Sequence, residues 1–318
     1  MSYQYLSIIE SEYNLKGPLA SKLIHDGPDN YVYIVTDANS KKYALRVNKR
    51  LGKKVSFELE VLVALAQKGL NVTRPIENKS KEYFVLIDNR QVVLFDFIDG
   101  TQVEKLDTEH LETDVIERGA RKFGEFHTFT NNMKVETVPN RNIFTEYDRL
   151  FALDTDSLKK FTDYQILLKQ VKTFYSEAQL KIKEGKELYG VIHNDYRIQN
   201  LIYTKNDCYI IDLDWACYGP ILKDLGLAIA EWSMYKKDTG PSKLSIYRFI
   251  NAYNETAPKI VAYDKELIFW ICFACLSDTC TFIADVVQNN YKYGDIAIND
   301  VNQCYMYRKF KCFYKELK

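Results

Sequence analysis

The chain has 318 residues and a formal net charge of zero, with 43 basic and 43 acidic side chains. This balance creates no overall field that would draw the protein to nucleic acid or an anionic membrane, so we expect a small or neutral partner. Hydrophobic residues make up 47% of the chain and charged residues 27%, which is typical of a globular protein with a substantial core and excludes disorder.

The N-terminal stretch MSYQYLSIIESEYNLKG has no basic flank followed by an apolar run, so it does not read as a signal peptide. No uninterrupted apolar run approaches the roughly 20 residues that span a bilayer. We therefore expect a soluble, cytoplasmic protein.

The first hundred residues alternate strand patterns with turns. The run NYVYIVTDANSKKYALRV (30–47) holds two β-rich segments around an Asp-Ala-Asn-Ser turn and predicts a hairpin. In KVSFELEVLVALAQKG (54–69) the apolar residues fall at helical spacing and Gly69 ends the pattern, which predicts a helix. The runs EYFVLI (82–87) and QVVLFDFI (91–98), separated by turn residues, predict a second hairpin.

After Gly100 the pattern becomes helical, in residues 114–130, in 163–185 and from Pro241 to the end, and only 191–212 interrupts it with strands. This layout predicts an α+β protein. Its expected parts are a small antiparallel-sheet lobe (1–95), a connector (96–100) and a larger, mainly helical lobe (101–318).

The seven cysteines all lie at or after Cys208, and Cys272, Cys275 and Cys280 share an apolar, helix-like run. A metal site would need a fourth ligand and a loop-like setting. We therefore expect these thiols to pack in the core, as in a reducing compartment.

The stretch VIHNDYRIQNLIYTKNDCYIIDLDWA (191–216) places polar side chains between short apolar runs, where an unpaired charge costs several kcal/mol or more. If the turn is centred on Asn206, antiparallel pairing puts Asn200 opposite Asp212. An amide oxygen beside a carboxylate makes a hard-oxygen site suited to Mg²⁺. Asp195, on the loop that enters the hairpin, is placed to orient a hydroxyl nucleophile.

The order Asp-x-x-x-x-Asn, strand hairpin and second Asp matches a kinase catalytic loop and its metal-binding aspartate. The forms HNDYRIQN and IIDLDWA resemble the aminoglycoside phosphotransferase and choline kinase family, and the resemblance covers nearly the whole chain. It implies a protein-kinase-like, two-lobed fold. It also implies in-line transfer of the γ-phosphoryl group of ATP or GTP, with Mg²⁺, to a small-molecule hydroxyl.

The resemblance assigns roles to individual residues. Asp195 would accept the proton of the hydroxyl, and the metal would be held by Asn200, Asp212 and Asp214, the last of which alternatively only braces the loop. DGPDNYVYIV resembles the phosphate-covering turn, YALRV stands where kinases have Val-Ala-Ile-Lys, and LFDFIDG resembles the connector beside adenine. The implied nucleotide-binding residues are therefore Gly27, Asn30, Ala44, Arg46, Glu58, Phe95 and Phe97.

Strand alternation independently puts Ala44 and Arg46 on one face. Arg46 replaces the more usual lysine, keeps the charge and can grip phosphate oxygens with two nitrogens. Glu58 is its expected ion-pair partner. Glu60 is the alternative, because the two glutamates lie about 200° apart around a helix and cannot both face inward.

The acceptor pocket is expected in the helical lobe beside Asp195. Its candidate residues are Trp215, Tyr218, Glu231, Trp232, Asp278 and Asp285, of which Trp232 alternatively belongs to the core. Aromatic rings with carboxylates suit a cationic acceptor. Within the family, choline, ethanolamine, homoserine, amino sugars and aminoglycosides are phosphorylated.

HND replaces His-Arg-Asp, DLD replaces Asp-Phe-Gly, and no activation segment follows, which favours a small-molecule acceptor over a protein. Two alternatives stay open: a nucleotide-binding pseudokinase, suggested by Arg46, and an atypical Ser/Thr protein kinase. We expect Asp224 to be a helix cap or a backbone brace, His193 to brace the catalytic loop and His127 to be a packed histidine.

Overall fold

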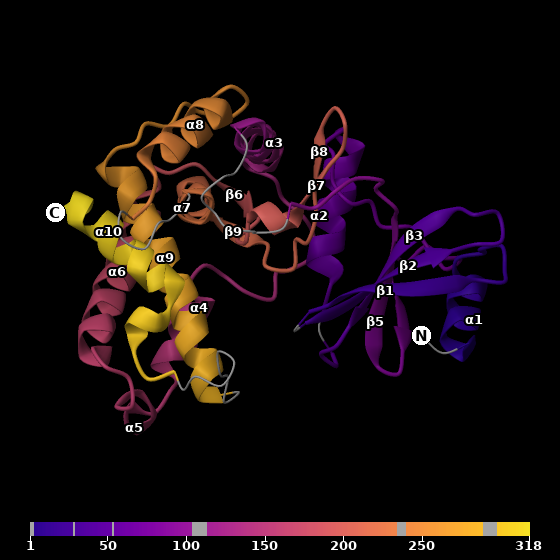
Figure 1. Ribbon diagram of the computed structural model, residues 1–318, viewed down its shortest axis with the longest axis horizontal. Helices are drawn as coiled ribbons and strands as arrows, with labels where there is room; N and C mark the ends of the chain where they lie inside the picture. Colours follow the sequence, from indigo (N-terminus) through magenta and orange to yellow (C-terminus); the bar gives the residue numbers. More distant parts are fainter. Residues whose placement is uncertain (1–2, 28, 53, 104–112, 234–239, 289–297) are drawn as a thin grey trace. The chain divides into compact units, whose positions relative to one another are not determined.

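The computed structural model describes residues 3–27, 29–52, 54–103, 113–233, 240–288 and 298–318. The chain divides into two compact units. The first unit comprises Met1–Thr101, Val135–Asn140 and Ile202–Asp214, and the second comprises Gln102–Lys134, Arg141–Leu201 and Trp215–Lys318. The predicted α+β class is confirmed, since the first unit is built on a sheet and the second is mainly helical (Figure 1).

The first unit contains a five-stranded sheet in the order β1-β2-β3-β5-β4, in which each pair of neighbouring strands is antiparallel. The strands are β1 (Ala20–Asp26), β2 (Asn30–Thr36), β3 (Lys42–Asn48), β4 (Val85–Ile87) and β5 (Arg90–Asp96). Both predicted hairpins are confirmed, as β2–β3 and β4–β5. The second turns through Asp88 and Asn89 at positive φ, a conformation that these two residue types tolerate.

Two elements of the first unit were not predicted, α1 (Tyr3–Glu12) and the edge strand β1. β1 is largely exposed and therefore lacks the apolar alternation that marks a half-buried strand. α1 packs through Ile9 on the sheet face that carries Leu45 and Leu94. Arg46 points to the opposite face of β3, and α2 (Ser56–Gln67) lies on that side.

The hairpin of β7 (Leu201–Tyr203) and β8 (Cys208–Ile210) was predicted, but its place differs from the expected one. We assigned it to the helical lobe, whereas residues 202–214 belong to the first unit. The amide of Ile210 donates to Asn71 O at 3.0 Å, and the amide of Tyr203 donates to Thr101 O at 2.8 Å. These bridges bring Asp212 and Asp214 into the first unit.

The three predicted helical regions of the second unit are confirmed, and they contain α3 (Thr113–Thr130), α6 (Tyr164–Glu184), α8 (Lys243–Asn254), α9 (Lys265–Gln288) and α10 (Tyr305–Leu317). α7 (Ile221–Trp232), the short helices α4 (Thr145–Phe151) and α5 (Thr155–Leu158), and the pair β6 (Tyr189–Ile192) and β9 (Cys217–Pro220) complete it. The short elements were not predicted, since four to seven residues carry too little periodicity to identify.

α9 forms the core of the second unit and packs against α4, α6, α7 and α10 (Figure 1). By length and composition α9 could cross a membrane, although polar residues interrupt its apolar run. However, 83% of its most apolar segment is buried inside the protein. Its three cysteines are buried and free, as predicted. At Gly226, α7 approaches α9 so closely that a Cβ atom there would lie 2.7 Å from Ile271 N.

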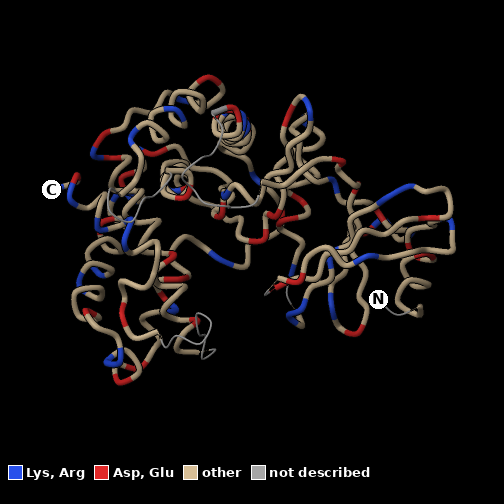
Figure 2. Tube along the Cα trace, viewed as in Figure 1, with Lys and Arg blue, Asp and Glu red and all other residues tan. Residues whose placement is uncertain are grey.

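Figure 2 shows acidic and basic residues interspersed along the described parts of both units, in keeping with a net charge of zero. The charged groups that bear on function instead form one buried to half-buried cluster within each unit.

Candidate active site

The cluster in the first unit is built on the predicted ion pair between Arg46 and Glu58. Arg46 Nη1 and Nη2 donate to the two carboxylate oxygens of Glu58 at 2.6 and 2.7 Å, and both side chains are buried. Glu60 points elsewhere and accepts from Thr137 N at 2.9 Å and Thr137 Oγ1 at 2.6 Å. The choice of Glu58 over Glu60 is confirmed, because only one of the two can face β3 from a single helix.

Two aspartates that follow β8 complete this cluster. Arg46 Nη1 lies 3.4 Å from Asp214 Oδ1 and 3.9 Å from Asp212 Oδ1. Asn30 Nδ2, from the start of β2, donates to Asp214 Oδ2 at 2.8 Å. Asp212 has a φ of 62°, a left-handed conformation that aspartate and asparagine adopt more readily than most residues. The structure thus joins residues from four segments of the chain.

The cluster has the chemistry of a divalent-cation site. Carboxylate oxygens of Glu58, Asp212 and Asp214 all lie within 4.8 Å of one another, and they face one guanidinium, that of Arg46. Burial, aided by Asp214 and opposed by Arg46, raises the pKa of Glu58 to about 8. Clustered hard-oxygen donors with a surplus of negative charge fit Mg²⁺.

The other predicted nucleotide residues are more scattered. Ala44 pairs with Phe95 across the sheet, and Phe95 is buried with its ring 5.3 Å from the guanidinium carbon of Arg46. Gly27 lies in the β1–β2 turn, where its amide donates to Asn30 O at 3.1 Å. Phe97 lines a separate cavity of about 440 Å³ beside the end of α2. Their contacts with a nucleotide stay predictions.

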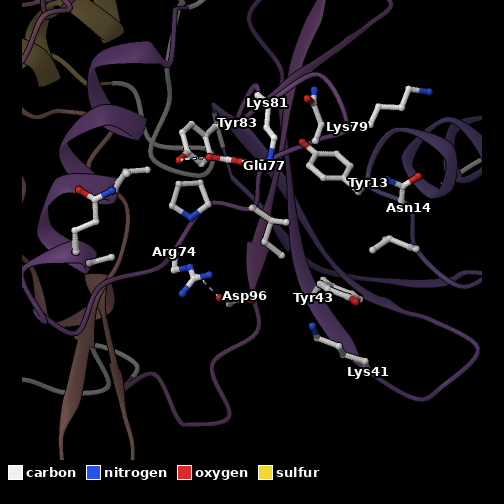
Figure 3. Close-up of a pocket in the computed structure, with 17 residues that line it drawn as sticks. Tyr13, Asn14, Lys41, Tyr43, Arg74, Glu77, Lys79, Lys81, Tyr83 and Asp96 are labelled. Atoms are coloured by element: carbon white, nitrogen blue, oxygen red, sulfur yellow. Dashed lines mark hydrogen bonds and ion pairs between the residues drawn. The ribbon is translucent and has the colours of Figure 1, made fainter.

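A larger hollow of about 930 Å³ lies elsewhere in the first unit, between the end of α1, the start of β3 and the segment 74–83 (Figure 3). Its charged groups are largely paired with each other: Arg74 Nε lies 3.7 Å from Asp96 Oδ2, and Tyr83 donates to Glu77 at 2.9 Å. The predicted site residues are not among those that line it.

In the second unit, the first turn of α7 holds the loop that carries Asp195. The backbone amides of His193 and Asn194 donate to the two carboxylate oxygens of Asp224, at 2.6 and 2.7 Å. His127 Nε2 lies 3.1 Å from the same carboxylate, and His127 Nδ1 lies 2.8 Å from Tyr253 Oη. Asp224 is thus a backbone brace and His127 a packed histidine, as predicted.

Electrostatics keep this brace charged. Burial works to raise the pKa of Asp224, but the hydrogen bond from His127 and the neighbouring positive charge of Lys223 outweigh burial and hold the pKa below its ordinary value. Lys223 is itself buried and donates to the side-chain oxygen of Asn194. Burial lowers the pKa of Lys223.

Asn200 lies at the end of the same loop and contacts Asp195. Its Nδ2 donates to Asp195 O at 2.8 Å and to Asp195 Oδ2 at 3.1 Å. With the amide nitrogen so engaged, the amide oxygen is the group that could accept or bind a metal. That Asn200 lies beside Asp212 stays a prediction.

Arg197 is the functional candidate that sequence reasoning missed. Its Nε donates to Asp195 Oδ1, its Nη2 lies 2.7 Å from Asp278 Oδ2, and its Nη1 lies 3.7 Å from Glu231 Oε1. Burial raises the pKa of Asp278 to about 6, opposed by Arg197 and reinforced by the nearby Glu231 and Asp195. The sequence signal for Arg197 was its position two residues after Asp195, but nothing in a single sequence shows which carboxylates Arg197 contacts.

The remaining acceptor candidates are Asp285, Trp232, Trp215 and Tyr218. Asp285 pairs with Arg149 at 2.7 Å. Trp232 is 1% exposed and its indole N–H donates to Tyr196 O at 3.2 Å, so the core alternative holds for this residue. The ring of Trp215 lies 3.7 Å from the guanidinium carbon of Arg141. Tyr218 lies in β9 and is partly exposed.

The two units together have the features of a kinase-like phosphotransferase. The first is an antiparallel sheet with a buried Arg–Glu pair and an aspartate cluster. The second is a helical unit with an Asp-x-x-x-x-Asn loop that is braced by a second aspartate. Residues 21–256 match the model of the phosphotransferase enzyme family, APH. The chain belongs to this family, and it is therefore a phosphotransferase.

Known proteins of similar sequence or fold carry names that agree with this class. The homoserine kinase of Caulobacter vibrioides is 22% identical over 281 residues, which cover 83% of this chain and 81% of that protein. The solved structure of an amicoumacin kinase with AMP-PNP, Ca²⁺ and its ligand covers 98% of this chain and 93% of its own at 14% identity, with a TM-score of 0.71. A microcompartment-associated aminopropanol kinase covers 99% and 98% at 16% identity, with a TM-score of 0.70.

Proposed function

We propose that this protein transfers the γ-phosphoryl group of ATP to the hydroxyl of a small molecule that also carries a positively charged amino group. The observation that carries the acceptor class is the cluster around Asp195. There, the carboxylates of Asp195, Glu231 and Asp278 surround the single guanidinium of Arg197. A site with this surplus of negative charge favours a cationic acceptor over an anionic one.

In the proposed reaction, the acceptor oxygen attacks the γ-phosphorus, Asp195 takes the hydroxyl proton, and the bond to the ADP oxygen breaks. Arg46, fixed by Glu58, would bind the α- and β-phosphates through charge and paired N–H donors. Because phosphoryl transfer passes through a loose transition state, the residues contribute mainly placement and charge neutralisation.

Mg²⁺ fits the carboxylate cluster of the first unit. Asp212 and Asp214 would hold the ion, and the amide oxygen of Asn200 is the further ligand that we propose. When bound, Mg²⁺ supplies positive charge against the phosphate oxygens.

The names of the relatives support the acceptor class. Homoserine and aminopropanol each combine a hydroxyl with an amino group, as do ethanolamine and the amino sugars. The alternatives are less well supported. A pseudokinase reading rested on Arg46 in place of lysine, yet Arg46 makes the full two-nitrogen pair with Glu58. We also propose that the protein works in the cytoplasm, without a nucleic-acid or membrane partner.

The test is Mg²⁺-dependent ADP release with homoserine, aminopropanol, ethanolamine, choline and amino sugars, run beside Asp195→Asn. Stimulation by one amino alcohol that disappears in the variant would support the proposal. If none of these acceptors stimulates ADP release although nucleotide raises the melting temperature, the proposed acceptor class is wrong. If nucleotide fails to raise the melting temperature at all, the assignment of ATP as donor is wrong.

A further inference from the structure

Each of the three nitrogens of the Arg197 guanidinium faces a carboxylate. Nε donates to Asp195, Nη2 contacts Asp278 and Nη1 faces Glu231. Both oxygens of Asp195 are thereby engaged, Oδ1 by Arg197 and Oδ2 by Asn200 at 3.1 Å. The side chain proposed to take the acceptor proton is therefore tied to a cation of its own chain.

The burial of these groups is uneven. The side chains of Glu231 and Asp278 are 3% and 20% exposed, whereas that of Arg197 is 36% exposed. The Arg197 side chain is thus the most exposed member of the cluster, and Glu231 is the most buried. A second basic residue, Lys223, is buried and donates to the side chain of Asn194 in the same loop.

We propose that Arg197 is a latch, a positioning residue that holds Asp195 until an amino-alcohol acceptor arrives. The ammonium group of the acceptor then takes over the carboxylates of Glu231 and Asp278, and the guanidinium releases Asp195. This inference rests on the proposed function and adds to it a reason why the enzyme would not hydrolyse ATP when the acceptor is absent.

The chemistry of the two fates of ATP is the same except for the nucleophile. With an acceptor, its oxygen bonds to the γ-phosphorus, its proton goes to Asp195, and ADP leaves with the electrons of the broken P–O bond. With water, the same bonds change and the products are ADP and inorganic phosphate. While Arg197 and Asn200 hold both oxygens of Asp195, neither oxygen is placed to accept the proton of a water molecule, so the latched state suppresses the second reaction.

The chain contains a matched control for a merely structural arginine. Arg149 pairs with Asp285 at 2.7 Å and with Glu146 at 2.8 Å. Asp285 lies on α9, as Asp278 does, and the side chain of Arg149 is 32% exposed. Arg149 therefore resembles Arg197 in its exposure and in pairing with an aspartate of α9, but its ion-pair partners do not include Asp195.

The experiment compares ADP release from Mg·ATP alone with ADP release in the presence of whichever amino alcohol stimulates the wild type. It uses Arg197→Met, Arg197→Lys and the control Arg149→Met. We expect Arg197→Met to raise the ratio of acceptor-independent to acceptor-dependent turnover about tenfold, which corresponds to about 1.4 kcal/mol of activation free energy. Arg197→Lys should restore most of the coupling, and Arg149→Met should leave the ratio unchanged.

Two outcomes with folded Arg197→Met would contradict the latch. An unchanged ratio in folded Arg197→Met would show that Arg197 is only structural, and an equal loss of both activities would show that it acts in the transfer itself. If Arg197→Met does not melt cooperatively, Arg197→Lys decides: a ratio modestly above that of the wild type supports the latch, and an unchanged ratio contradicts it. If instead the wild type shows no acceptor-stimulated turnover while still binding ATP, the proposed function fails before the latch is tested.

Discussion

At the scale of single residues, Asp212 offers a clean test of the proposed metal site. Because its φ is 62°, Asp212→Asn keeps a side chain that tolerates this conformation while removing the charge. We expect phosphoryl transfer to fall about 10²–10³-fold with little change in melting temperature, and the apparent affinity for Mg²⁺ to weaken. Steady-state rates over a Mg²⁺ titration, with thermal melting, measure both.

The control for that variant is Asp88→Asn, at another aspartate with positive φ (50°), in the β4–β5 turn. It should leave the Mg²⁺ dependence unchanged. Equal loss of activity in the two variants would point to a backbone effect and against a metal ligand.

A second residue-scale prediction concerns acidity. Burial raises the pKa of Asp278 to about 6, opposed by Arg197 and Lys223 and reinforced by Glu231 and Asp195, so its charge changes near pH 6. As pH falls through 6, Asp278 gains a proton and its attraction for an ammonium group is lost, so the KM for the acceptor should rise. Asp278→Asn should have a high KM that no longer changes between pH 5 and 7, whereas Asp285→Asn should behave as the wild type.

The raised pKa of Asp278 also affects stability, and here a rising pH is unfavourable although it favours acceptor binding. Because the folded-state pKa lies above the ordinary value of 3.8, the stability that protonated Asp278 contributes is fully present below pH 3.8 and is lost as pH rises through about 6. Melting temperatures of Asp278→Asn and wild type should therefore diverge with rising pH, the variant being favoured. A constant difference across that range would contradict the assigned pKa.

Some residue contacts followed from sequence and others could not. Strand alternation and helical spacing were enough to pair Arg46 with Glu58, because both patterns are local. Arg197 meets Asp278 across 81 positions of chain, and that contact depends on how α9 packs in the unit. No local pattern encodes such a contact.

At the scale of elements, the crossing of α7 and α9 controls the catalytic loop. Gly226 lies two residues after Asp224, and a Cβ atom there would meet the backbone of Trp270 and Ile271 at 2.7 Å. Gly226→Ala should therefore shift α7, cost about 1–3 kcal/mol of stability and lower kcat through the displaced loop. Chemical denaturation and steady-state kinetics on the same samples measure both effects.

The control for an effect of destabilisation alone is Gly185→Ala, at the C-terminal end of α6. There φ is 65° and no atom lies within 4 Å of the added Cβ, so the change should cost about 1 kcal/mol through backbone strain only. Its kcat should match the wild type. If Gly226→Ala also kept its kcat, the packing of α7 would not be what positions Asp195.

The elements that sequence predicted are those with long or strongly alternating patterns, such as α2, α3 and the two hairpins of the sheet. The missed α1 has a single fully buried position, Ile9, and β9 has four residues. These elements form because neighbours cover them, which is tertiary information.

At the scale of the whole molecule, the first unit is not a continuous piece of chain. It is completed by residues 135–140 and 202–214, and without the second of these the backbone groups of Asn71 and Thr101 lose their partners in β7 and β8. We expect a fragment of residues 1–101 to lack a cooperative thermal transition and to bind a hydrophobic dye. A sharp melt of that fragment would show that the sheet is self-sufficient.

This threading sets an order in time when the protein is made. The ribosome must pass residue 214 before the first unit can close, although its sheet is finished at residue 96. At about 5–20 residues per second, the roughly 120 residues from 97 to 214 keep that sheet waiting for about 6–24 s during synthesis. The first unit thus stays incomplete long after its sheet has been made, so codons and chaperones that act between residues 97 and 214 would govern the yield of a sheet encoded before them.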